Sequence, residues 1–382
     1  MQGEDDSEPE APGGSGTASD DAATGIASVR RGERLAPPKL LPSPGFAAWL
    51  AAEGGTLGFT TYQSSRLFLL SAGDGGELVA LERVVGSAMG LTMRQSAMWV
   101  ANKEQVWRFS NVGPFTVAEQ PYQALFMPRR GHLLGPCDTH DLLENVQFRG
   151  RHHELLFANT NFDCIASLDP HYGFVPVWQP AWVSERRGGD KSHLNGIGAR
   201  DGRLAFATAC ARSDEPMGWR KAQEDGGVVL DVETGTVLCD GLSMPHSPRW
   251  HDDRLWLLNS GTGDFGWVDT AAGRFKPVAL CAGFARGLCF VGGYAVIGLS
   301  RLRPNTFSSR MPLRTRLETL KVSERCGLLV VDPATGRTEH WLSIEGGVTE
   351  LYDVAFVPGL TRVYTPGFSE PALHRRIQHR PV

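Results

Sequence analysis

The chain has 382 residues, of which 21% are charged and 41% hydrophobic, and its formal net charge is −4. This length suffices for two ordinary domains or one large β domain. The near balance of charge argues against a nucleic-acid partner, because a surface that follows phosphates needs clustered cations. No apolar segment approaches the ~18–20 residues of a membrane-spanning helix, so we expect no membrane association.

The chain begins with an arm, residues 1–40, that is rich in Gly, Ser, Ala, Pro and acidic residues. Such a segment buries too little apolar surface to offset the entropy lost on folding, so we expect it to be disordered. Its acidic start lacks the basic and apolar segments of a signal peptide. The seven cysteines include no CxxC pair. We therefore expect a cytoplasmic protein with reduced thiols.

Short apolar segments separated by Gly and Pro follow from residue 56 onward, a pattern typical of an all-β protein. One hairpin motif recurs: a strand ends at Asp, turn residues and a Gly follow, and a new strand begins. Asp accepts hydrogen bonds from turn amides, and Gly adopts the positive φ that tight hairpins need. The copies are ASLDPHYGF (166–174), VVLDVETGT (228–236), GWVDTAAGR (266–274) and LVVDPATGR (329–337).

A second element recurs about every 40–65 residues, a period typical of four-stranded propeller blades with inserted loops. It is a polar cluster followed by an apolar strand: SAMGLTM (87–93), DTHDLLENV (138–146), HLNGIGA (193–199), HSPRWH (246–251), FARGLCF (284–290) and ELYDVAF (350–356). We predict a six-bladed β-propeller over residues 45–370 and a C-terminal tail, 371–382. ELYDVAF and strands within residues 58–85 would form the blade that closes the ring. Seven blades is the alternative, if residues 360–366 open another.

Two long insertions, residues 210–227 and 300–327, connect the second and third strands of their blades. In an antiparallel blade these connections open on the same face as the polar clusters that precede the inner strands. We therefore expect loops and unusual polar residues to converge on one rim, where sites on rigid scaffolds tend to lie. Trp219 in the first insertion is a candidate to cover a ligand there, and Asn259 begins a turn on the same face.

The residues that precede the inner strands form two candidate rings around the central channel. We align the six inner strands on their first buried residue, which is Trp250 in the fourth segment, HSPRWH. One ring then lies four positions before that residue and another lies two positions before it. The upper ring holds Asp138, His193, His246 and Glu350, and the lower ring holds His140, Asn195 and Arg286. The register around Pro248 is the one most open to a slip of one residue.

Histidines and carboxylates around one axis are the ligand types of Zn, Fe(II) or Mn(II). The predicted metal ligands are His140, His193, His246 and Glu350. The predicted catalytic residues are Glu350, Arg286 and Asp138, and the predicted substrate-binding residues are Asn195, Arg286, Trp219 and Asn259. The competing interpretation is structural, with histidines that cap blades or bond loop backbone. No Gly-rich phosphate loop is present, so we expect no nucleotide cofactor.

Several segments resemble a family of bacterial proteins known as a domain of unknown function: TYQSSRLFLL, SHLNGIG, FARGL, EGGVTELYDV and above all GLSMPHSPRWHDDRLWLLNSGTG (241–263). The resemblance covers roughly residues 56–358. In architecture the chain is also similar, at longer range, to the six-bladed propellers of the gluconolactonase, strictosidine synthase and streptogramin lyase group. That similarity implies a site at the channel mouth where a divalent cation binds or a base operates.

Together these patterns predict a metal-dependent enzyme that acts on a small molecule or modified peptide in the channel. A lyase, an isomerase or a lactone-type hydrolase fits best, in a role that suits specialised metabolism. The alternative is a non-catalytic propeller that binds a protein or peptide partner on its loop-bearing face. Loop 300–327 favours this alternative, because arginines recur along it.

Overall fold

Strands make up most of the regular structure in the computed structural model, which describes residues 37–117, 119–185, 187–303, 311–368 and 370. All of these residues belong to one unit, residues 34–382. The predicted arm lies outside the described residues up to residue 36, and so does the predicted tail, 371–382.

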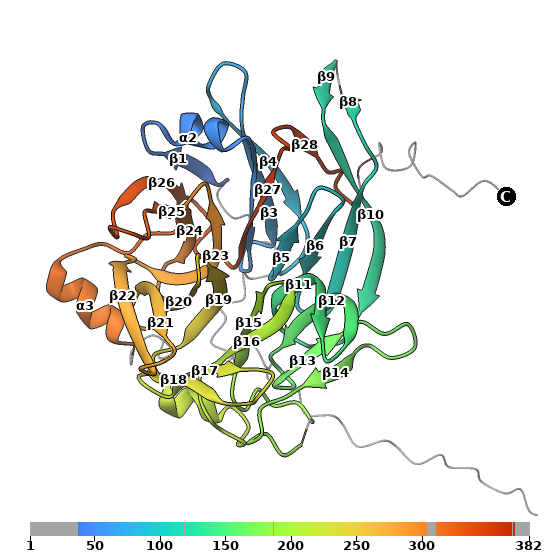
Figure 1. Ribbon diagram of the computed structural model, residues 1–382. Helices are drawn as coiled ribbons and strands as arrows, with labels where there is room; N and C mark the ends of the chain where they lie inside the picture. Colours follow the sequence, from blue (N-terminus) through green and yellow to red (C-terminus); the bar gives the residue numbers. More distant parts are fainter. Residues whose placement is uncertain (1–36, 118, 186, 304–310, 369, 371–382) are drawn as a thin grey trace, which may run out of the picture. The chain divides into compact units, whose positions relative to one another are not determined.

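The described strands pair into antiparallel units of four around a common axis (Figure 1). We call the strand nearest the axis the inner strand and name it first in each unit. The first unit contains β27 (Val354–Pro358), β2 (Gly55–Thr61), β3 (Arg66–Ala72) and β4 (Leu78–Val84). The second contains β5 (Leu91–Met93), β6 (Ala97–Ala101), β7 (Gln105–Asn111) and β10 (Ala124–Leu133). The third contains β11 (Thr139–Phe148), β12 (Arg151–Asn159), β13 (Cys164–Ser167) and β14 (Val175–Trp178).

Three further units continue the ring. The fourth contains β15 (Leu194–Arg200), β16 (Arg203–Ala209), β17 (Gly227–Asp231) and β18 (Val237–Leu242). The fifth contains β19 (Pro245–His251), β20 (Arg254–Asn259), β21 (Asp264–Asp269) and β22 (Arg274–Leu280). The sixth contains β23 (Phe284–Val291), β24 (Tyr294–Ser300), β25 (Gly327–Val331) and β26 (Thr338–Glu345).

Smaller strands extend this pattern. β1 (Lys39–Pro42) pairs with β26 and includes the last two residues of the predicted arm, and β8 (Phe115–Val117) pairs with β9 (Gln120–Tyr122). β28 (Val363–Tyr364) lies in the stretch on which the seven-blade alternative depends. It pairs with β10 as an additional outer strand.

The inner strands close into a ring. β5 packs against β11, β11 against β15, β15 against β19, β19 against β23, β23 against β27, and β27 back against β5. The closing unit joins both ends of the domain, because β27 pairs antiparallel with β2 from Phe59–Val354 to Gly55–Pro358. This arrangement confirms the predicted all-β propeller closed by N- and C-terminal strands. The blade count of six stays a prediction, with which the six units agree.

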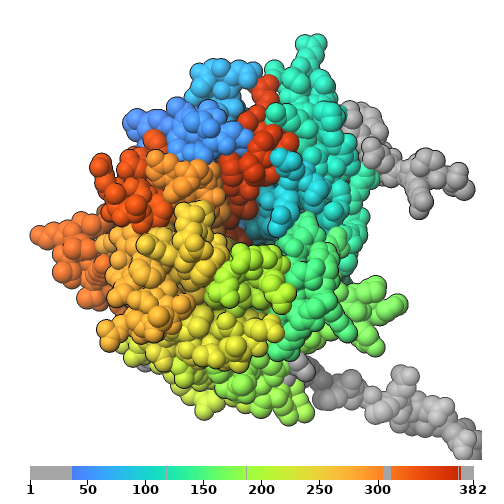
Figure 2. Space-filling view, in the orientation of Figure 1, coloured from blue at the N-terminus to red at the C-terminus, as the bar shows by residue number. Residues whose placement is uncertain are grey.

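The recurring hairpins and the long insertions lie where the sequence places them. Each Asp–Gly hairpin joins the third and fourth strands of its unit. The insertions connect β16 to β17 and β24 to β25. They contain a 3-10 helix, η1 (Gly218–Ala222), and a short α-helix, α3 (Pro312–Leu320), which projects at the rim of the ring in Figures 1 and 2.

The core lies between neighbouring sheets. Helix α2 (Phe46–Glu53) fills the gap between the first and sixth units, where Phe46 and Leu50 pack with Leu57 of β2 and Ile344 of β26. Burying each such side chain contributes roughly 1.5–3 kcal/mol. The two long insertions share a separate apolar cluster with Met244 and Phe284. No helix in the described part of the chain is long and apolar enough to cross a membrane.

Candidate functional site

Strand pairing shows which inner-strand residues occupy equivalent positions around the channel. The equivalent pairs in four successive units are Thr139–Asn159, Leu194–Ala209, Pro245–Asn259 and Ala285–Leu299. The residues that follow on the inner strands therefore share one ring: His140, Asn195, His246 and Arg286. Tyr352 belongs to the same ring, because the carbonyl of Leu351 before it accepts a hydrogen bond from Ser300 just as the carbonyl of Ala285 accepts one from Ser260.

The position of His246 differs from the sequence-based register. The structure places His246 in the lower ring, and Met244 takes its expected place above. The carbonyl of Met244 accepts from Nδ1 of His246 (2.9 Å) as the carbonyl of Asp138 accepts from Nδ1 of His140 (2.7 Å). The error arises because Pro248, not Trp250, occupies the position that Leu142 and Ile197 hold in their units.

Two hydroxyl groups determine which nitrogen of His140 and of His246 carries the proton. Thr160 donates to the carbonyl of Leu194 (2.7 Å), so toward Nδ1 of His140 (2.8 Å) it must act as the acceptor. Ser260 likewise donates to the carbonyl of Ala285 (2.7 Å) and accepts from Nδ1 of His246 (3.1 Å). In the imidazoles of both His140 and His246, Nδ1 is therefore protonated and Nε2 keeps its lone pair.

The amide of Asn195 agrees with this assignment for His246. Thr208 donates to Oδ1 of Asn195 (2.7 Å), which leaves the amide nitrogen to donate to Nε2 of His246 (3.3 Å). Burial lowers the pKa of both imidazoles well below the ordinary value, and the charges of His193 and Arg286 lower it further. His140 and His246 are therefore neutral at pH 7.

His193 joins these two histidines from the upper ring. Its ring centroid lies 4.9 Å from that of His140, and its Nδ1 lies 2.9 Å from a carboxylate oxygen of Asp190. Trp219 of η1 donates through its indole nitrogen to the same carboxylate (2.8 Å) and packs on the His193 ring at 4.3 Å. Trp219 is buried, so it supports His193 from behind.

Arg286 is the charged member of the lower ring. Its guanidinium lies 5.0 Å from the ring centre of Tyr352 and 4.9 Å from that of Phe284. Only 9% of Arg286 and 5% of Tyr352 is exposed, and neither Nε of Arg286 nor the hydroxyl of Tyr352 has a hydrogen-bond partner within the described residues. Burial and the neighbouring Arg303 lower the pKa of Arg286, although Tyr352 and Glu350 oppose this. The ring thus contains a cation and a hydroxyl that protein groups leave unsatisfied.

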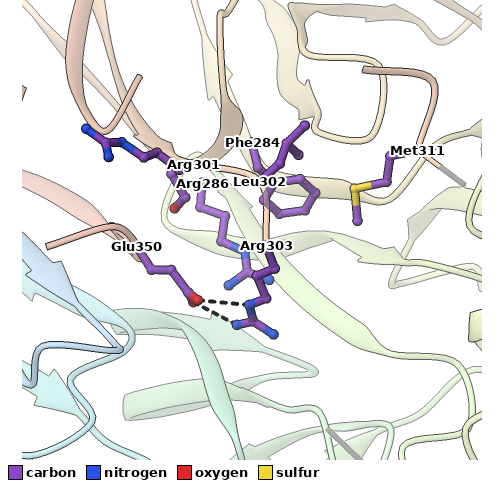
Figure 3. A pocket seen from close by; sticks show the side chains of 8 residues that line it. Phe284, Arg286, Arg301, Leu302, Arg303, Met311 and Glu350 are labelled. Atoms are coloured by element: carbon purple, nitrogen blue, oxygen red, sulfur yellow. Dashed lines mark hydrogen bonds and ion pairs between the residues drawn. The ribbon is translucent and has the colours of Figure 1, made fainter. Parts of the chain in front are cut away.

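Glu350 lies beside Arg286 in one small pocket (Figure 3). Its carboxylate accepts two hydrogen bonds from Arg303, at 2.9 and 2.7 Å. Asp138 precedes β11, and its carboxyl has a raised pKa because of burial, which the charge of Lys103 opposes. Asn259, the last residue of β20, serves the backbone instead: its side-chain oxygen accepts from the amide of Ser243 in the connection between β18 and β19 (2.8 Å).

The predicted metal can be tested against the donor groups. Histidines that bind metals through Nε2 usually donate Nδ1–H to a carbonyl or a carboxylate. His140, His193 and His246 all have such an anchor. However, no three His, Cys, Asp or Glu side chains among the residues described converge closely enough to hold an ion. We therefore derive no chemical step through a metal.

An ion pair fills the centre of the ring below the histidines. Arg249 of β19 makes two hydrogen bonds of 2.9 Å to Asp141 of β11. The same guanidinium donates to the carbonyls of Leu288 (3.0 Å) and Ile197 (3.1 Å). It thereby connects the inner strands β11, β15, β19 and β23 on the side of the ring away from the long insertions.

Sequence reasoning missed three members of the site. Tyr352 shares the register of Arg286, but a tyrosine in a propeller is hard to tell from a packing residue. Asp190 lies three residues before His193. This spacing is compatible with a pair between the two side chains, but it is too common by chance to indicate one. Arg303 lies in the long insertion 300–327, and no local sequence pattern indicates which residue it pairs with.

The fold and the site define a β-propeller with a polar cluster of histidine, arginine and tyrosine at the channel mouth. The chain belongs to the family described as Domain of unknown function (DUF4915), whose profile matches residues 44–365. No curated protein matches it.

Solved structures with some likeness to the chain include a nidogen/laminin complex, a protein of unknown function from Bacteroides caccae and the computationally designed Ika8 protein. The TM-scores are 0.49, 0.45 and 0.38, and the sequence identities are 13%, 9% and 11%. The matches cover 81%, 79% and 79% of this chain and 100%, 98% and 90% of the respective chains. The propeller assignment therefore rests on the strand pairing.

Proposed function

We propose that this protein is an enzyme that transforms a small molecule or modified peptide at the channel mouth. Proton transfer, as in a lyase or isomerase, or hydrolysis of a lactone are the reaction classes. The observation that carries the proposal is the pair of buried, neutral imidazoles of His140 and His246. Each has its Nδ1 proton held by a carbonyl and a hydroxyl, so Nε2 is the basic nitrogen. Nε2 of His246 accepts a hydrogen bond from the Asn195 amide (3.3 Å), which it has to give up before it can take a proton.

The surroundings of these imidazoles suit a general base. A neutral imidazole with an unprotonated nitrogen accepts a proton, and its fixed ring needs no reorientation as it does so. The lowered pKa keeps both bases unprotonated at neutral pH. Arg286 beside them stabilises negative charge that develops when the proton leaves. Asn195 orients His246 through its amide.

Mass spectrometry of a bacterial metabolite extract tests this proposal without a known substrate. Tag-free protein is incubated with the extract, and the compounds consumed and formed are compared with those from a His140→Gln/His246→Gln variant. Loss of a general base typically costs about 10²–10⁴-fold in rate, so the variant should leave the substrate unchanged. His152→Gln, which alters an exposed histidine of β12, should behave like the wild type. No difference between the wild type and the double variant would refute the proposal.

A divalent metal is the second and weaker form of this proposal. The anchored Nδ1 atoms of His140, His193 and His246 support it, but these side chains do not converge on one point in the described structure. A metal would require them to move together, and it would then supply Lewis-acid chemistry. Inductively coupled plasma mass spectrometry should then find about one metal per chain, which His193→Ala/His246→Ala removes. A wild type that takes up no metal on reconstitution excludes this form and leaves the metal-free base.

A non-catalytic partner-binding role is the other candidate, and one observation favours it. Leu313 and Leu317 fix α3 to the ring, whereas Leu320 and Val322 at its end are exposed. A partner bound there should be lost from pull-downs with Leu320→Asp/Val322→Asp but retained by His140→Gln/His246→Gln. Val79→Asp, at an exposed position of β4, is the matched control.

A further inference from the structure

We infer that the site takes a small carboxylic acid, whose carboxylate binds to the guanidinium of Arg286 and the hydroxyl of Tyr352. This inference rests on the proposed function and deepens it by naming the substrate class. Its basis is that Arg286, unlike its neighbours, has no ion-pair partner in the described part of the chain.

Arg286 differs from the other arginines that reach the channel. Arg249 pairs with Asp141, and Arg303 pairs with Glu350 through two hydrogen bonds. Arg286 is buried to a similar extent, yet no ion pair to it is found in the described part of the chain, and its guanidinium lies over the faces of Phe284 and Tyr352. Glu350 is near enough to oppose the lowering of its pKa, but the Glu350 carboxylate is hydrogen-bonded to Arg303. A buried cation without a counter-ion is costly, so proteins retain one chiefly where a ligand supplies the missing charge.

The net charge of the side chains around Arg286 matches a ligand with a single negative charge. Arg286, Arg303 and Glu350 line one pocket and together carry one excess positive charge. Arg301 also lines this pocket, but its guanidinium points away from the other three residues (Figure 3). A monoanion would neutralise the pocket, whereas a phosphate dianion would leave it negative.

The shapes of the two donors indicate a carboxylate. A planar guanidinium fork donates two parallel hydrogen bonds to the two oxygens of a carboxylate. The hydroxyl of Tyr352, which has no partner in the described structure, is a third donor beside it. Burial raises the pKa of Tyr352 well above its ordinary value, so the phenol keeps its proton and donates. The pocket that Arg286 lines has a free volume of about 20 Å³, so without rearrangement it admits only a small group.

The carboxylate site lies beside the proposed bases. Arg286 follows His246 in the order of the inner strands, and the Phe284 ring that contacts the guanidinium lies 5.5 Å from the His246 ring. On the other side, Tyr352 lies 5.2 Å from His140, measured between ring centroids. A carboxylate bound here would bring the rest of a small acid toward these two imidazoles.

NMR titration with propionate, propionamide and methylphosphonate tests the inference. Propionate should shift the Arg286 Nε–H resonance, assigned by its loss in Arg286→Gln, while the uncharged propionamide should not. Propionate should bind Arg286→Gln at least about tenfold more weakly and Tyr352→Phe several-fold more weakly. Arg212→Gln, which alters an exposed arginine paired with Asp240, should bind like the wild type.

The variant is expected to fold, because Arg286→Gln removes an uncompensated buried charge, and its Tm should equal or exceed that of the wild type. Stronger binding of methylphosphonate than of propionate, or no binding of any anion, would overturn the inference. Propionate binding should persist in His140→Gln/His246→Gln. If it does and no substrate is converted, the proposed function fails and the inference stands. If Arg286→Gln converts substrate at an unchanged rate, the inference fails together with the charge-stabilising role of Arg286, while the role of the two imidazoles in the proposed function stands.

Discussion

Asp141 and Asp353 show how single side chains join neighbouring blades. Asp141 accepts from the amide of Ile197 (3.1 Å) on the next inner strand, and Asp353 accepts from the amide of Leu91 (2.8 Å). Arg249 neutralises Asp141 directly, whereas Asp353 has no such ion pair among the salt bridges of the described residues. The two carboxylates therefore differ in how they respond to pH.

The stability of the protein should contain a pH-dependent contribution from Asp353. Burial and then the charge of Asp141 raise the pKa of Asp353 to about 7, although Arg249 opposes this. An unfolded Asp titrates near about 3.9. Between these values the folded state retains a proton that the unfolded state has released, so this contribution falls as pH rises from about 4 to about 7.

Urea unfolding of the wild type and Asp353→Asn at pH 5 and pH 8 checks this sign. The free energy of unfolding of the wild type, relative to that of the variant, should be larger at pH 5. A difference that is the same at both pH values would contradict the assignment.

Much of the site could be predicted from residue types and spacing. What could not be predicted is the exact strand register and the choice of pairing partner. His140, Asn195 and Arg286 lie in one ring as expected, because alternation along a strand reliably assigns side chains to one face. His246 was placed wrongly because Trp250 looked like the first buried residue of β19, whereas Pro248 holds that position. The unpaired state of Arg286 could not be predicted, since it depends on which arginine Glu350 binds.

At the scale of elements, close approach between inner strands depends on glycine. Gly287 of β23 has φ +74°, and a Cβ placed there would lie 2.6 Å from the amide nitrogen of Val354 and 2.7 Å from Cα of Asp353. Gly202, between β15 and β16, has φ +73° with no atom within 4 Å of the same position. The two glycines share a conformation and differ only in their surroundings.

Gly287→Ala and Gly202→Ala therefore separate conformational strain from contact between blades. Gly202→Ala should cost about 1 kcal/mol in the free energy of unfolding, from the left-handed conformation alone. Gly287→Ala should cost a further 1–3 kcal/mol or so, because the methyl group overlaps backbone that cannot move. Chemical denaturation measures both values. Equal losses would show that the inner strands do not constrain one another at this point.

The sequence predicts elements best where turn chemistry is explicit. The four Asp–Gly hairpins specify their own φ values and hydrogen bonds, and all four join the strands expected. Helices α2 and α3 were not expected, because eight or nine residues are too few to display a helical period. The position of α2 depends on the gap between the first and sixth sheets, and that of α3 on the apolar cluster of the two insertions; both arise only in the assembled ring.

The whole ring depends on its closure by β2 and β27. Leu57 of β2 is fully buried and pairs with Phe356 of β27 and Leu70 of β3. Leu57→Ala should lower the free energy of unfolding by about 2–5 kcal/mol. Since every inner strand packs between two neighbours, we expect the loss to spread around the ring.

Hydrogen–deuterium exchange distinguishes this from local damage. In Leu57→Ala the slowest amides of all the inner strands, including β15 on the far side, should exchange faster by the same factor. Faster exchange confined to β27, β2 and β3 would mean that the blades unfold independently.

The position of Arg249 affects the route by which a molecule can reach the proposed site. Its guanidinium bonds across four inner strands below the histidines, so it obstructs the centre of the ring on that side. We therefore expect the proposed site to be reached only from the rim that carries the long insertions. In the proposed enzyme a product would have to leave by that same opening before the next substrate could enter.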